Sequence, residues 1–412
     1  MRTDVRVCLV VAVLLGFGCG DDSIEPGATG GGTGDESEGE GPGADESTSG
    51  DQADSDTGAP AECSARRHTL LDEEPCGQVA IADLDADGVD DVLVVAGFNT
   101  FIAPAVTDKR MYSYEGTDPL LGSPEVHCCL RSGDALFATA LDVNGDGRED
   151  PLVAVQQALI SGDVGTVVDD LEMWLRGPQG GYVDQPRVAR DNGLGFGPRP
   201  AVGQFVPDAP GIVMGLGENM LLYESDGLGL VYQGVALELA ENAIEVGVVD
   251  LDGDGLDDAV VRTSTSIARV HNDGDGSFAL MSQAELPLSG LMHLADLDGD
   301  GVLEVLLVGS EGLAVGQLDG DDASWAVQGL AMTGPVALAD VDTDGVVDLV
   351  STDATTVVAY SGIGDGTFSD DASILSTAAG EKVVDLDVGD VDGDGRDAVV
   401  VCDEQGVLVI DP

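Results

Sequence analysis

A nine-residue loop rich in aspartate recurs along the chain, and each copy lies between two apolar runs. The first copy is Asp83–Asp91, and the others begin at Asp142, Asp250, Asp296, Asp340 and Asp390. The segment Gln204–Asp208 keeps the place of a copy in the series but has lost the carboxylates. The intervals between first residues run from 44 to 62 residues. A repeat of this kind requires a fold built from similar units.

The arrangement of residues in the loop is that of a metal site. Acids occupy positions one, three, five and nine in most copies, and position six is glycine in all of them. Carboxylates so placed converge on one point, position seven adds a backbone carbonyl, and glycine permits the sharp turn. A shell of roughly six to eight oxygens is the one that Ca²⁺ prefers. The sequence therefore predicts calcium sites.

Five copies are predicted to form complete sites. Their expected ligands, with position seven acting through its carbonyl, are Asp83, Asp85, Asp87, Val89 and Asp91; Asp142, Asn144, Asp146, Arg148 and Asp150; Asp250, Asp252, Asp254, Leu256 and Asp258; Asp296, Asp298, Asp300, Val302 and Glu304; and Asp340, Asp342, Asp344, Val346 and Asp348. The sixth copy keeps Asp390, Asp392, Asp394 and Arg396. It is doubtful, because Asp397 arrives one residue early and Ala398 holds the ninth place. No metal is predicted at Gln204.

Two other interpretations of the loop are less consistent with the sequence. A single copy is also typical of a solvated turn, because Asp and Gly favour turns, but six copies in register favour metal. An EF-hand needs a Glu at position twelve and flanking helices. Here short Val-rich runs such as Val92–Val95 follow the loop at once, and such runs are typical of strands.

The spacing predicts a seven-bladed β-propeller, an all-β fold, because a propeller blade is typically a repeat of roughly 40–50 residues with four strands. In the fourth unit the expected strands are Ile244–Val249, Ala259–Arg262, Ser266–His271 and Ser277–Met281. The loops then join the first and second strands of most blades. Three residues before each loop lie mostly small residues, as a crowded centre requires; His293 and Asp387 are exceptions that we expect to face a wet channel.

These units resemble the FG-GAP/VCBS repeats of integrin-alpha-type calcium-binding β-propellers. The resemblance covers roughly residues 66–412, and Asn272–Phe278 and Gly362–Phe368 match the second motif of that family. It implies that the loop joins the innermost strand to the next and binds calcium at the positions given above.

The chain ends predict how the ring closes. After the last loop only Ala398–Cys402 and Gly406–Ile410 remain as strands, so we expect Arg66–Leu71 to supply the missing outer strand. Cys63 and Cys402 would then approach each other, and a disulfide there would lock the ring. After Cys19 the chain has the cysteines Cys63, Cys76, Cys128, Cys129 and Cys402. Their number is odd, so at least one is free or paired between chains.

The first part of the chain has a different composition. Residues 1–18 read as a signal peptide, with arginines before a short apolar run. Cys19 follows and resembles the lipidated cysteine of a bacterial lipoprotein; cleavage near Gly18 or Gly20 with secretion is the alternative. Residues 19–62 then form the lipidated cysteine and a Gly/Ser/Asp/Glu linker expected to be disordered. Residues 63–412 form the propeller.

Composition bounds the function. The formal net charge is −62, which excludes a nucleic-acid partner. No nucleophile elbow or phosphate loop is present, so we expect no enzyme. We expect a calcium-stabilised binding or adhesion module for an extracellular protein or glycan, exported to the bacterial outer membrane or cell surface, or secreted. It touches the membrane only through its lipid.

Two alternatives stay open, a polysaccharide-active, lyase-like enzyme and a purely structural surface protein. Long loops on a rigid scaffold often carry function, and the extra lengths of the first two units lie around Asn99–Arg131 and Ile160–Arg199. The second of these carries Trp174 and Tyr182.

Overall fold

The computed structural model describes residues 64–68, 75–96, 109–117, 121–130, 134–161, 164–177, 182–184, 188–191, 199–207, 209–317, 324–330, 332, 334–353, 355–380 and 382–412. Contacts divide the chain into Met1–Thr57 and Gly58–Pro412, and every described residue lies in the second unit. The expected signal peptide, Cys19 and the linker lie outside the described residues. No helix long and apolar enough to cross a membrane occurs in the described part.

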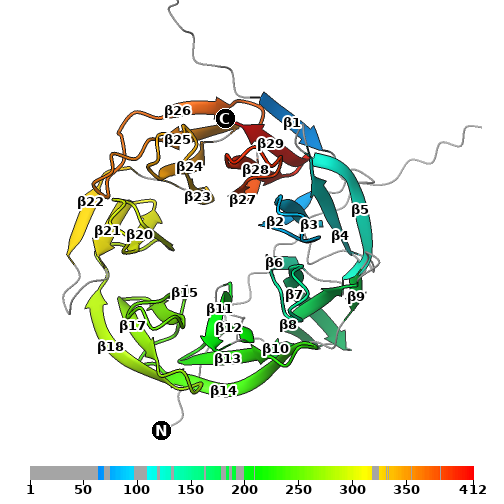
Figure 1. Cartoon of the computed structure of the whole chain (residues 1–412), viewed down its shortest axis with the longest axis vertical. Coiled ribbons are helices and arrows are strands. Elements are labelled where there is room, and N and C mark those ends of the chain that lie inside the picture. Colours follow the sequence, from blue (N-terminus) through cyan, green and yellow to red (C-terminus); the bar gives the residue numbers. More distant parts are fainter. Residues whose placement is uncertain are drawn as a thin grey trace, which may run out of the picture. The chain divides into compact units, whose positions relative to one another are not determined.

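The described residues form seven antiparallel sheets arranged as blades around a central axis (Figure 1). The predicted all-β, seven-bladed propeller is therefore confirmed. In each blade the strand that precedes the Asp-rich loop, or its worn copy, lies innermost.

The strands follow the chain in blade order. Blade 1 is β2 (Cys76–Ala82), β3 (Asp91–Ala96), β4 (Lys109–Gly116) and β5 (Leu121–Leu130). Blade 2 is β6 (Asp134–Leu141), β7 (Asp150–Ser161), β8 (Val164–Arg176), β9 (Tyr182–Asp184) and β10 (Ala189–Asp191). Blade 3 is β11 (Ala201–Val206), β12 (Ala209–Leu216), β13 (Asn219–Ser225) and β14 (Leu230–Glu238). Blade 4 is β15 (Glu245–Val249), β16 (Asp258–Arg262), β17 (Ser266–Asn272) and β18 (Phe278–Glu285).

The remaining three blades complete the ring. Blade 5 is β19 (Leu291–Ala295), β20 (Glu304–Gly309), β21 (Gly312–Gln317) and β22 (Trp325–Gln328). Blade 6 is β23 (Val336–Ala339), β24 (Asp348–Asp353), β25 (Thr356–Tyr360) and β26 (Ser373–Ser376). Blade 7 is β27 (Val383–Gly389), β28 (Ala398–Asp403), β29 (Gly406–Asp411) and β1 (Ser64–His68).

The hydrophobic core is divided among the seven seams between blades. In β3, Val92 and Val94 pack toward blade 7, whereas Leu93 and Val95 pack toward blade 2. Successive side chains of a strand point to opposite faces, so a strand buried on both faces needs a continuous apolar run. This is why the second strands contain continuous apolar runs such as Val92–Val95, Leu152–Val155 and Val305–Val308. Seven apolar clusters, one for each pair of neighbouring blades, close the ring.

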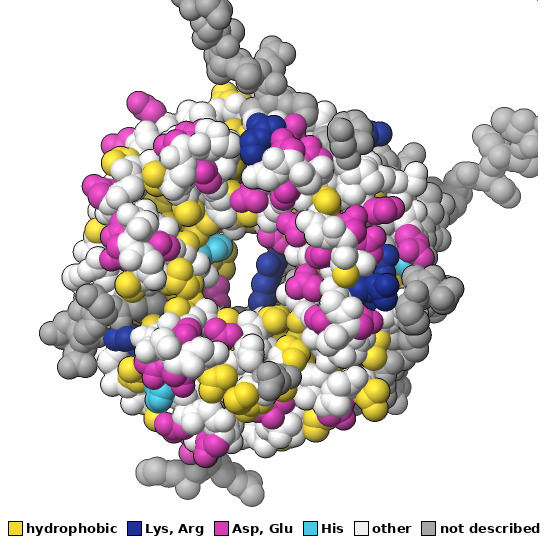
Figure 2. Space-filling model, in the orientation of Figure 1, with side chains coloured by type: hydrophobic (Ala, Val, Ile, Leu, Met, Phe, Trp, Pro, Cys, Tyr) yellow, Lys and Arg dark blue, Asp and Glu magenta, His cyan; other side chains and the backbone are white. Residues whose placement is uncertain are grey.

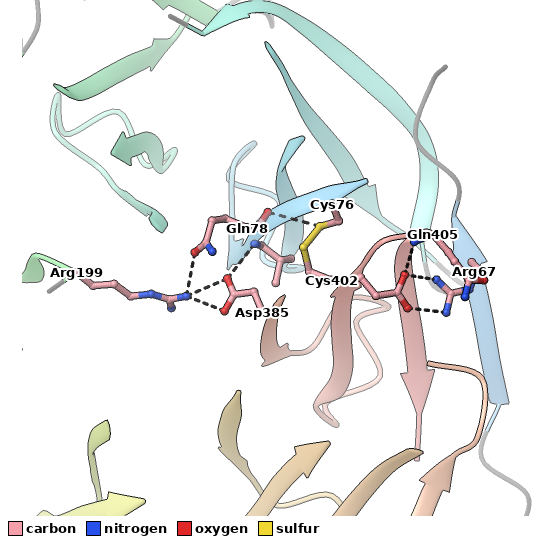
Figure 3. The surroundings of a disulfide bond; sticks show 9 residues. Arg67, Cys76, Gln78, Arg199, Asp385, Cys402 and Gln405 are labelled. Atoms are coloured by element: carbon pink, nitrogen blue, oxygen red, sulfur yellow. Dashed lines mark hydrogen bonds and ion pairs between the residues drawn. A yellow bond between two sulfur atoms is a disulfide. The ribbon is translucent and has the colours of Figure 1, made fainter. Parts of the chain in front are cut away.

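The predicted closure by the N-terminal segment is confirmed. Strand β1 pairs antiparallel with β29, from Ser64 opposite Asp411 to His68 opposite Val407. Arg67 reaches the fully buried Asp403, with Nη1 and Nη2 donating to the carboxylate at 2.7 and 2.8 Å (Figure 3). The last blade therefore takes its outer strand from the start of the propeller.

The predicted Cys63–Cys402 disulfide is wrong. Cys402 is bonded to Cys76, with their Cα atoms 5.3 Å apart (Figure 3). Cys76 begins the innermost strand of blade 1, which lies against blade 7 in one apolar cluster with Cys402. The bond still locks the ring, but it joins the first and last blades across their seam and does not tie β1 to its sheet. Cys63 lies outside the described residues.

The segments interpreted as long loops are largely strands. Most of the described part of Asn99–Arg131 is the hairpin β4–β5, and Ile160–Arg199 contains the whole of β8, β9 and β10. Trp174 is not a surface recognition residue, since it is 5% exposed and lies in the cluster between blades 1 and 2. In the described residues, the extra length of the second unit therefore forms strands of blade 2.

Candidate metal centres and seam pockets

The first aspartate of each loop organises the backbone around it. In the first loop, Oδ1 of Asp83 accepts the N–H of Ala86 at 2.7 Å, and Oδ2 accepts the N–H of Gly88 at 3.1 Å. The N–H of the glycine at position six is held in the same way in the other five loops, at 2.8–3.0 Å, by Asp142, Asp250, Asp296, Asp340 and Asp390. Six separate segments thus fold into one loop geometry.

The third and fifth acids continue the pattern. Asp85 accepts the N–H of Asp87 at 3.2 Å, and Asp87 accepts the N–H of Val89 at 2.9 Å. Each position-seven residue, including Arg148, Leu256, Val302, Val346 and Arg396, donates its N–H to the acid two residues earlier. Hydrogen bonds from backbone N–H groups therefore hold these side chains in place by themselves.

Two residues in each loop adopt a left-handed backbone. Position six has a φ between +84° and +88° and is always glycine, as the sequence predicts. Position four also has a positive φ, which sequence reasoning missed. Glycine fills position four in four loops, but Ala86 has a φ of 65° and Thr343 a φ of 60°. A non-glycine residue in this region carries strain, and a β-branched one such as threonine carries more.

The ninth acid ties the loop to the blade. Asp91, Asp150, Asp258, Glu304 and Asp348 are at most 2% exposed, and each accepts the N–H of position two in its own loop at 2.8–3.3 Å. In blades 1 and 2 the second oxygen accepts the N–H of Gly116 at 2.8 Å and of Arg176 at 2.7 Å. Burial raises the pKa of Asp91 and of Asp150 to about 6. The ninth carboxylate thus has a structural role of its own, and Asp91 and Asp258 also lie in clusters of acids that could hold a metal ion.

The predicted ligands come together in clusters. Oxygen atoms of Asp83, Asp85 and Asp91 lie within 4.8 Å of one another, and so do those of the first three acids of the loops that begin at Asp250, Asp296 and Asp340. The donor atoms of these four clusters are oxygen, which suits a hard cation of the calcium type better than a soft transition metal. In blade 4, Nδ1 of His271 also lies 3.1 Å from Asp258 and 3.5 Å from Asp252. The residues therefore fit the ion that the sequence predicts.

The blade-7 loop differs from the other five at its ninth place, whereas its position-seven arginine pairs with the fifth acid as Arg148 does with Asp146 in blade 2, at 3.8 Å. Arg396 donates from Nη2 to Oδ2 of Asp394 at 2.6 Å, and its guanidinium also lies 3.5 Å from Asp411. Ala398 is buried at the ninth place. Asp397 occupies position eight, and burial together with the charges of Asp90, Asp390 and Asp340 raises its pKa. A guanidinium therefore already neutralises part of this loop.

Position eight has a role that sequence reasoning did not find. The N–H of Asp90 donates to the carbonyl of Asp390 in the preceding blade at 3.0 Å, and the N–H of Asp390 donates back to Asp90 at 3.0 Å. Asp257 and Gln204 exchange the same two bonds, at 2.9 and 2.6 Å. Neighbouring loops are therefore linked directly, and the worn copy keeps this link.

The segment at Gln204 in blade 3 has lost the carboxylates of the other loops, and a buried aromatic side chain packs there. Phe205 is fully buried and its ring lies 5.9 Å from that of Phe278 in blade 4. Gln204 retains only the backbone bridge to Asp257. This arrangement explains how blade 3 keeps its place in the ring without the loop carboxylates.

The innermost strands of blades 7 and 1 are joined by side chains. Asp385 and Asp387 accept the N–H groups of Val79 and Ile81, at 3.1 and 3.0 Å. Arg199 reaches Asp385 with Nη2 2.8 Å from Oδ1 (Figure 3), and Figure 2 shows a basic side chain in the central opening. Burial raises the pKa of Asp387 to about 6. Asp387, the aspartate expected to face a wet channel, thus accepts a hydrogen bond from the unpaired edge of β2.

His293, the other expected channel residue, is partly exposed. Its Nε2 atom is buried and has no hydrogen-bond partner among the described residues. Burial, together with the charge of Arg199, lowers the pKa of His293 to about 4. The imidazole is therefore neutral at physiological pH.

Two pockets lie at equivalent places beside metal loops. The first, of about 120 Å³, is lined by Asp85, Asp91, Ser113, Glu115, Ser123, Glu125 and Arg176. The second, of about 250 Å³, is lined by Asp298, Glu304, Val315, Gln317, Ser324, Trp325, Ala326, Asp365 and Gly366. Both use the third and ninth loop positions of one blade and a residue of the next blade. These two pockets therefore share one place in the blade, the seam beside an acidic loop.

The fold and the loops define the class of protein: a seven-bladed β-propeller with repeated acidic loops between the first and second strands of its blades. Residues 250–307 and 340–401 match the model of the FG-GAP-like repeat. These two stretches are accordingly FG-GAP-like repeats within a seven-bladed propeller, as the resemblance predicts. A search of curated proteins found no match.

Solved structures share the fold at low sequence identity. A lectin of Agrocybe aegerita, described as recognising non-reducing terminal N-acetylglucosamine, is 14% identical with a TM-score of 0.50, over 81% of this chain and 86% of the lectin chain. A protein from Lactobacillus plantarum is 16% identical with a TM-score of 0.49, over 76% of this chain and 86% of that chain. At this identity the likeness concerns the fold alone.

Proposed function

We propose that the chain is a calcium-stabilised β-propeller, tethered to a cell surface, that binds an extracellular protein or glycan. The observation that carries the proposal is the repeated loop geometry. Five loops place acids at positions one, three, five and nine, with Asn144 as the one amide, around backbone fixed by the same hydrogen bonds. Such loops gather like charges, which is costly unless a cation neutralises them.

The blade-7 loop is proposed as a weak site at most. Arg396 already donates to Asp394, and no acid stands at the ninth place. An ion would have to compete with a guanidinium for the fifth carboxylate. Blade 3 is proposed to bind no metal. The ring thus has five strong sites, one weak site and one blade held by apolar packing.

Binding is supported by the fixed arrangement of the side chains beside the first pocket. Tyr182 packs edge-on against His127 at 4.4 Å. His127 accepts or donates a 2.8 Å hydrogen bond with Ser113 and is buried. One structure with a similar fold belongs to a lectin, which is compatible with a glycan-binding role on this scaffold.

Thermal unfolding tests the calcium assignment. Removal of calcium by a chelator is expected to lower the melting temperature strongly, because a ligand that binds only the folded state stabilises it by mass action. Restoring calcium, but not magnesium, should restore the melt, since magnesium demands a smaller octahedral shell. An unchanged melting temperature after chelation would exclude a stabilising role for calcium.

The tether is tested separately. Cys19 is proposed to carry the lipid, with residues 20–62 as the spacer. The Cys19→Ser variant is expected to move from the membrane fraction to the soluble fraction of cells. Membrane association that persists in this variant would disprove the lipid anchor and leave the calcium assignment untouched.

A further inference from the structure

The smaller seam pocket has a chemistry of its own. Its lining includes Asp85 and Asp91 of the first loop and four residues of β4 and β5 in the same blade. Arg176, at the end of β8 in blade 2, completes the lining. The pocket therefore joins a metal loop, an outer hairpin and the neighbouring blade.

The register shows that this pocket and the larger one are repeats of one place in the blade. Ser113 lies opposite Glu125, as Val315 lies opposite Ala326. Glu115 corresponds to Gln317, which lies opposite the ninth acid Glu304. The blade therefore provides the hollow, and the side chains decide what it can bind. In the first pocket the variable positions are carboxylates and a guanidinium.

The polar side chains around this pocket are held in place. The Arg176 side chain is 14% exposed, lies 4.0 Å from Asp91 and sits 5.7 Å from the centre of the Tyr182 ring. The His127 ring meets the same Tyr182 ring edge-on at 4.4 Å and contacts Ser113. A group that is held before the ligand arrives loses less entropy on binding. Arg176 and Ser113 are thus positioned as fixed partners of a ligand.

The donors and acceptors select a ligand with many hydroxyl groups. The lining offers four carboxylates as acceptors, at Asp85, Asp91, Glu115 and Glu125, against one guanidinium and two serine hydroxyls. Anionic groups are repelled by this excess of acid, whereas sugar hydroxyls both donate and accept hydrogen bonds. A volume of about 120 Å³ limits the contact to one sugar unit or part of it.

We propose that the seam pocket between blades 1 and 2 binds a terminal sugar of a neutral glycan, with Arg176, Ser113, Ser123, Glu115 and Glu125 as its hydrogen-bonding groups. This inference rests on the proposed calcium-dependent binding function and names its site.

Calcium and sugar binding are coupled in this site. Asp85 and Asp91 belong both to the first loop and to the pocket wall. These two residues would help to hold an ion in the loop, and the ion would neutralise part of their charge. Sugar binding is therefore stronger in the presence of calcium, and by linkage the sugar strengthens calcium binding at this loop by the same factor.

The test uses the full chain with and without calcium on an array of neutral and acidic oligosaccharides. Wild type is expected to bind neutral glycans in the presence of calcium. Glu125→Gln, which changes an exposed pocket acid outside the metal loop, is expected to weaken this binding about tenfold, because a hydrogen bond to a charged group is lost. Glu285→Gln, an exposed acid on the outer strand of blade 4, is the matched control and should bind as wild type.

The possible outcomes distinguish a failure of the seam pocket from a failure of the proposed calcium-dependent binding function. Calcium-dependent glycan binding that is unaffected by Glu125→Gln and by Ser123→Ala would overturn the seam pocket but keep the proposed module. Stabilisation by calcium with no binding to any neutral glycan would overturn the sugar specificity. Unchanged melting temperatures of both variants in calcium show that they are folded, so a loss of binding then supports the pocket.

Discussion

At the scale of single residues, the loop is a backbone device as much as a set of ligands. Its carboxylates accept N–H groups from positions four to seven, and the chain must adopt a left-handed backbone at two places. The aspartates and the glycine at position six could be predicted from the sequence. Position four could not, because Ala86 and Thr343 give no sign that their backbone is left-handed. The strain appears only when the coordinates are known.

The strain at Thr343 predicts a stabilising substitution. Thr343 is exposed and has a φ of 60°, so Thr343→Gly relieves strain without removing buried contacts. The free energy of unfolding in saturating calcium is expected to rise by about 1 kcal/mol. Gly345→Ala is the opposite control: φ is +85° and nothing lies within 4 Å of the added Cβ, so it should lose a similar amount through strain alone. Denaturant titration measures both, and a less stable Thr343→Gly would contradict the account.

The ninth acids predict how calcium binding depends on pH. In the metal-free protein, burial raises the pKa of Asp91 and Asp150 to about 6, above the ordinary value of 3.8. A raised pKa means that the folded state holds these protons more tightly than the unfolded state. The metal-free protein is therefore expected to gain stability as the pH falls from about 6 to about 4. Because calcium needs the charged carboxylate, calcium affinity should fall over the same interval.

Calorimetric calcium titrations and metal-free melting curves at several pH values check both halves of this expectation. Asp91→Asn removes one of the two titrating groups, so its calcium affinity at the first loop should be lower and its metal-free stability less dependent on pH. A calcium affinity that is the same at pH 5 and pH 7 would contradict the role of the ninth acids.

At the scale of strands and blades, local patterns carry much of the information. Continuous apolar runs, loop spacing and the missing last strand predicted the second strands, the blades and the closure by β1. Contacts between blades were harder to predict. The partner of Cys402 is Cys76 because β2 lies against blade 7, and the bridge from Asp90 to Asp390 joins residues 300 positions apart. No local sequence pattern reports which residues of two neighbouring blades meet.

The Cys76–Cys402 bond predicts how firmly the ring is closed. It joins the first and last blades across a sequence separation of 326 residues. The Cys76→Ala, Cys402→Ala double variant is expected to lose about 2–4 kcal/mol of stability, because a long loop in the unfolded chain is no longer constrained. Reductant should lower the melting temperature of wild type and leave that of the double variant unchanged. Equal melting temperatures of the two oxidised proteins would show that the seam holds without the bond.

At the scale of the whole molecule, the residues that repeat from blade to blade and those that do not have different proposed roles. The repeated loops are proposed to stabilise the ring, and the described residues that do not repeat, such as Arg176 and Glu125, carry the proposed recognition. The sequence located the acidic loops but not the pocket, because its wall combines two strands of one blade with the end of a strand in the next. The net charge of −62 also belongs to this scale. Calcium bound at the proposed sites would neutralise part of it where the acids are most crowded.

The count of bound calcium ions tests the central claim most directly. Native mass spectrometry of the purified chain in calcium is expected to show five tightly bound ions, with a sixth only at high calcium. The Asp296→Asn, Asp298→Asn variant should carry one ion fewer, because it removes two acids from a single loop. A chain that carries no calcium, or a count that this variant leaves unchanged, would contradict the account.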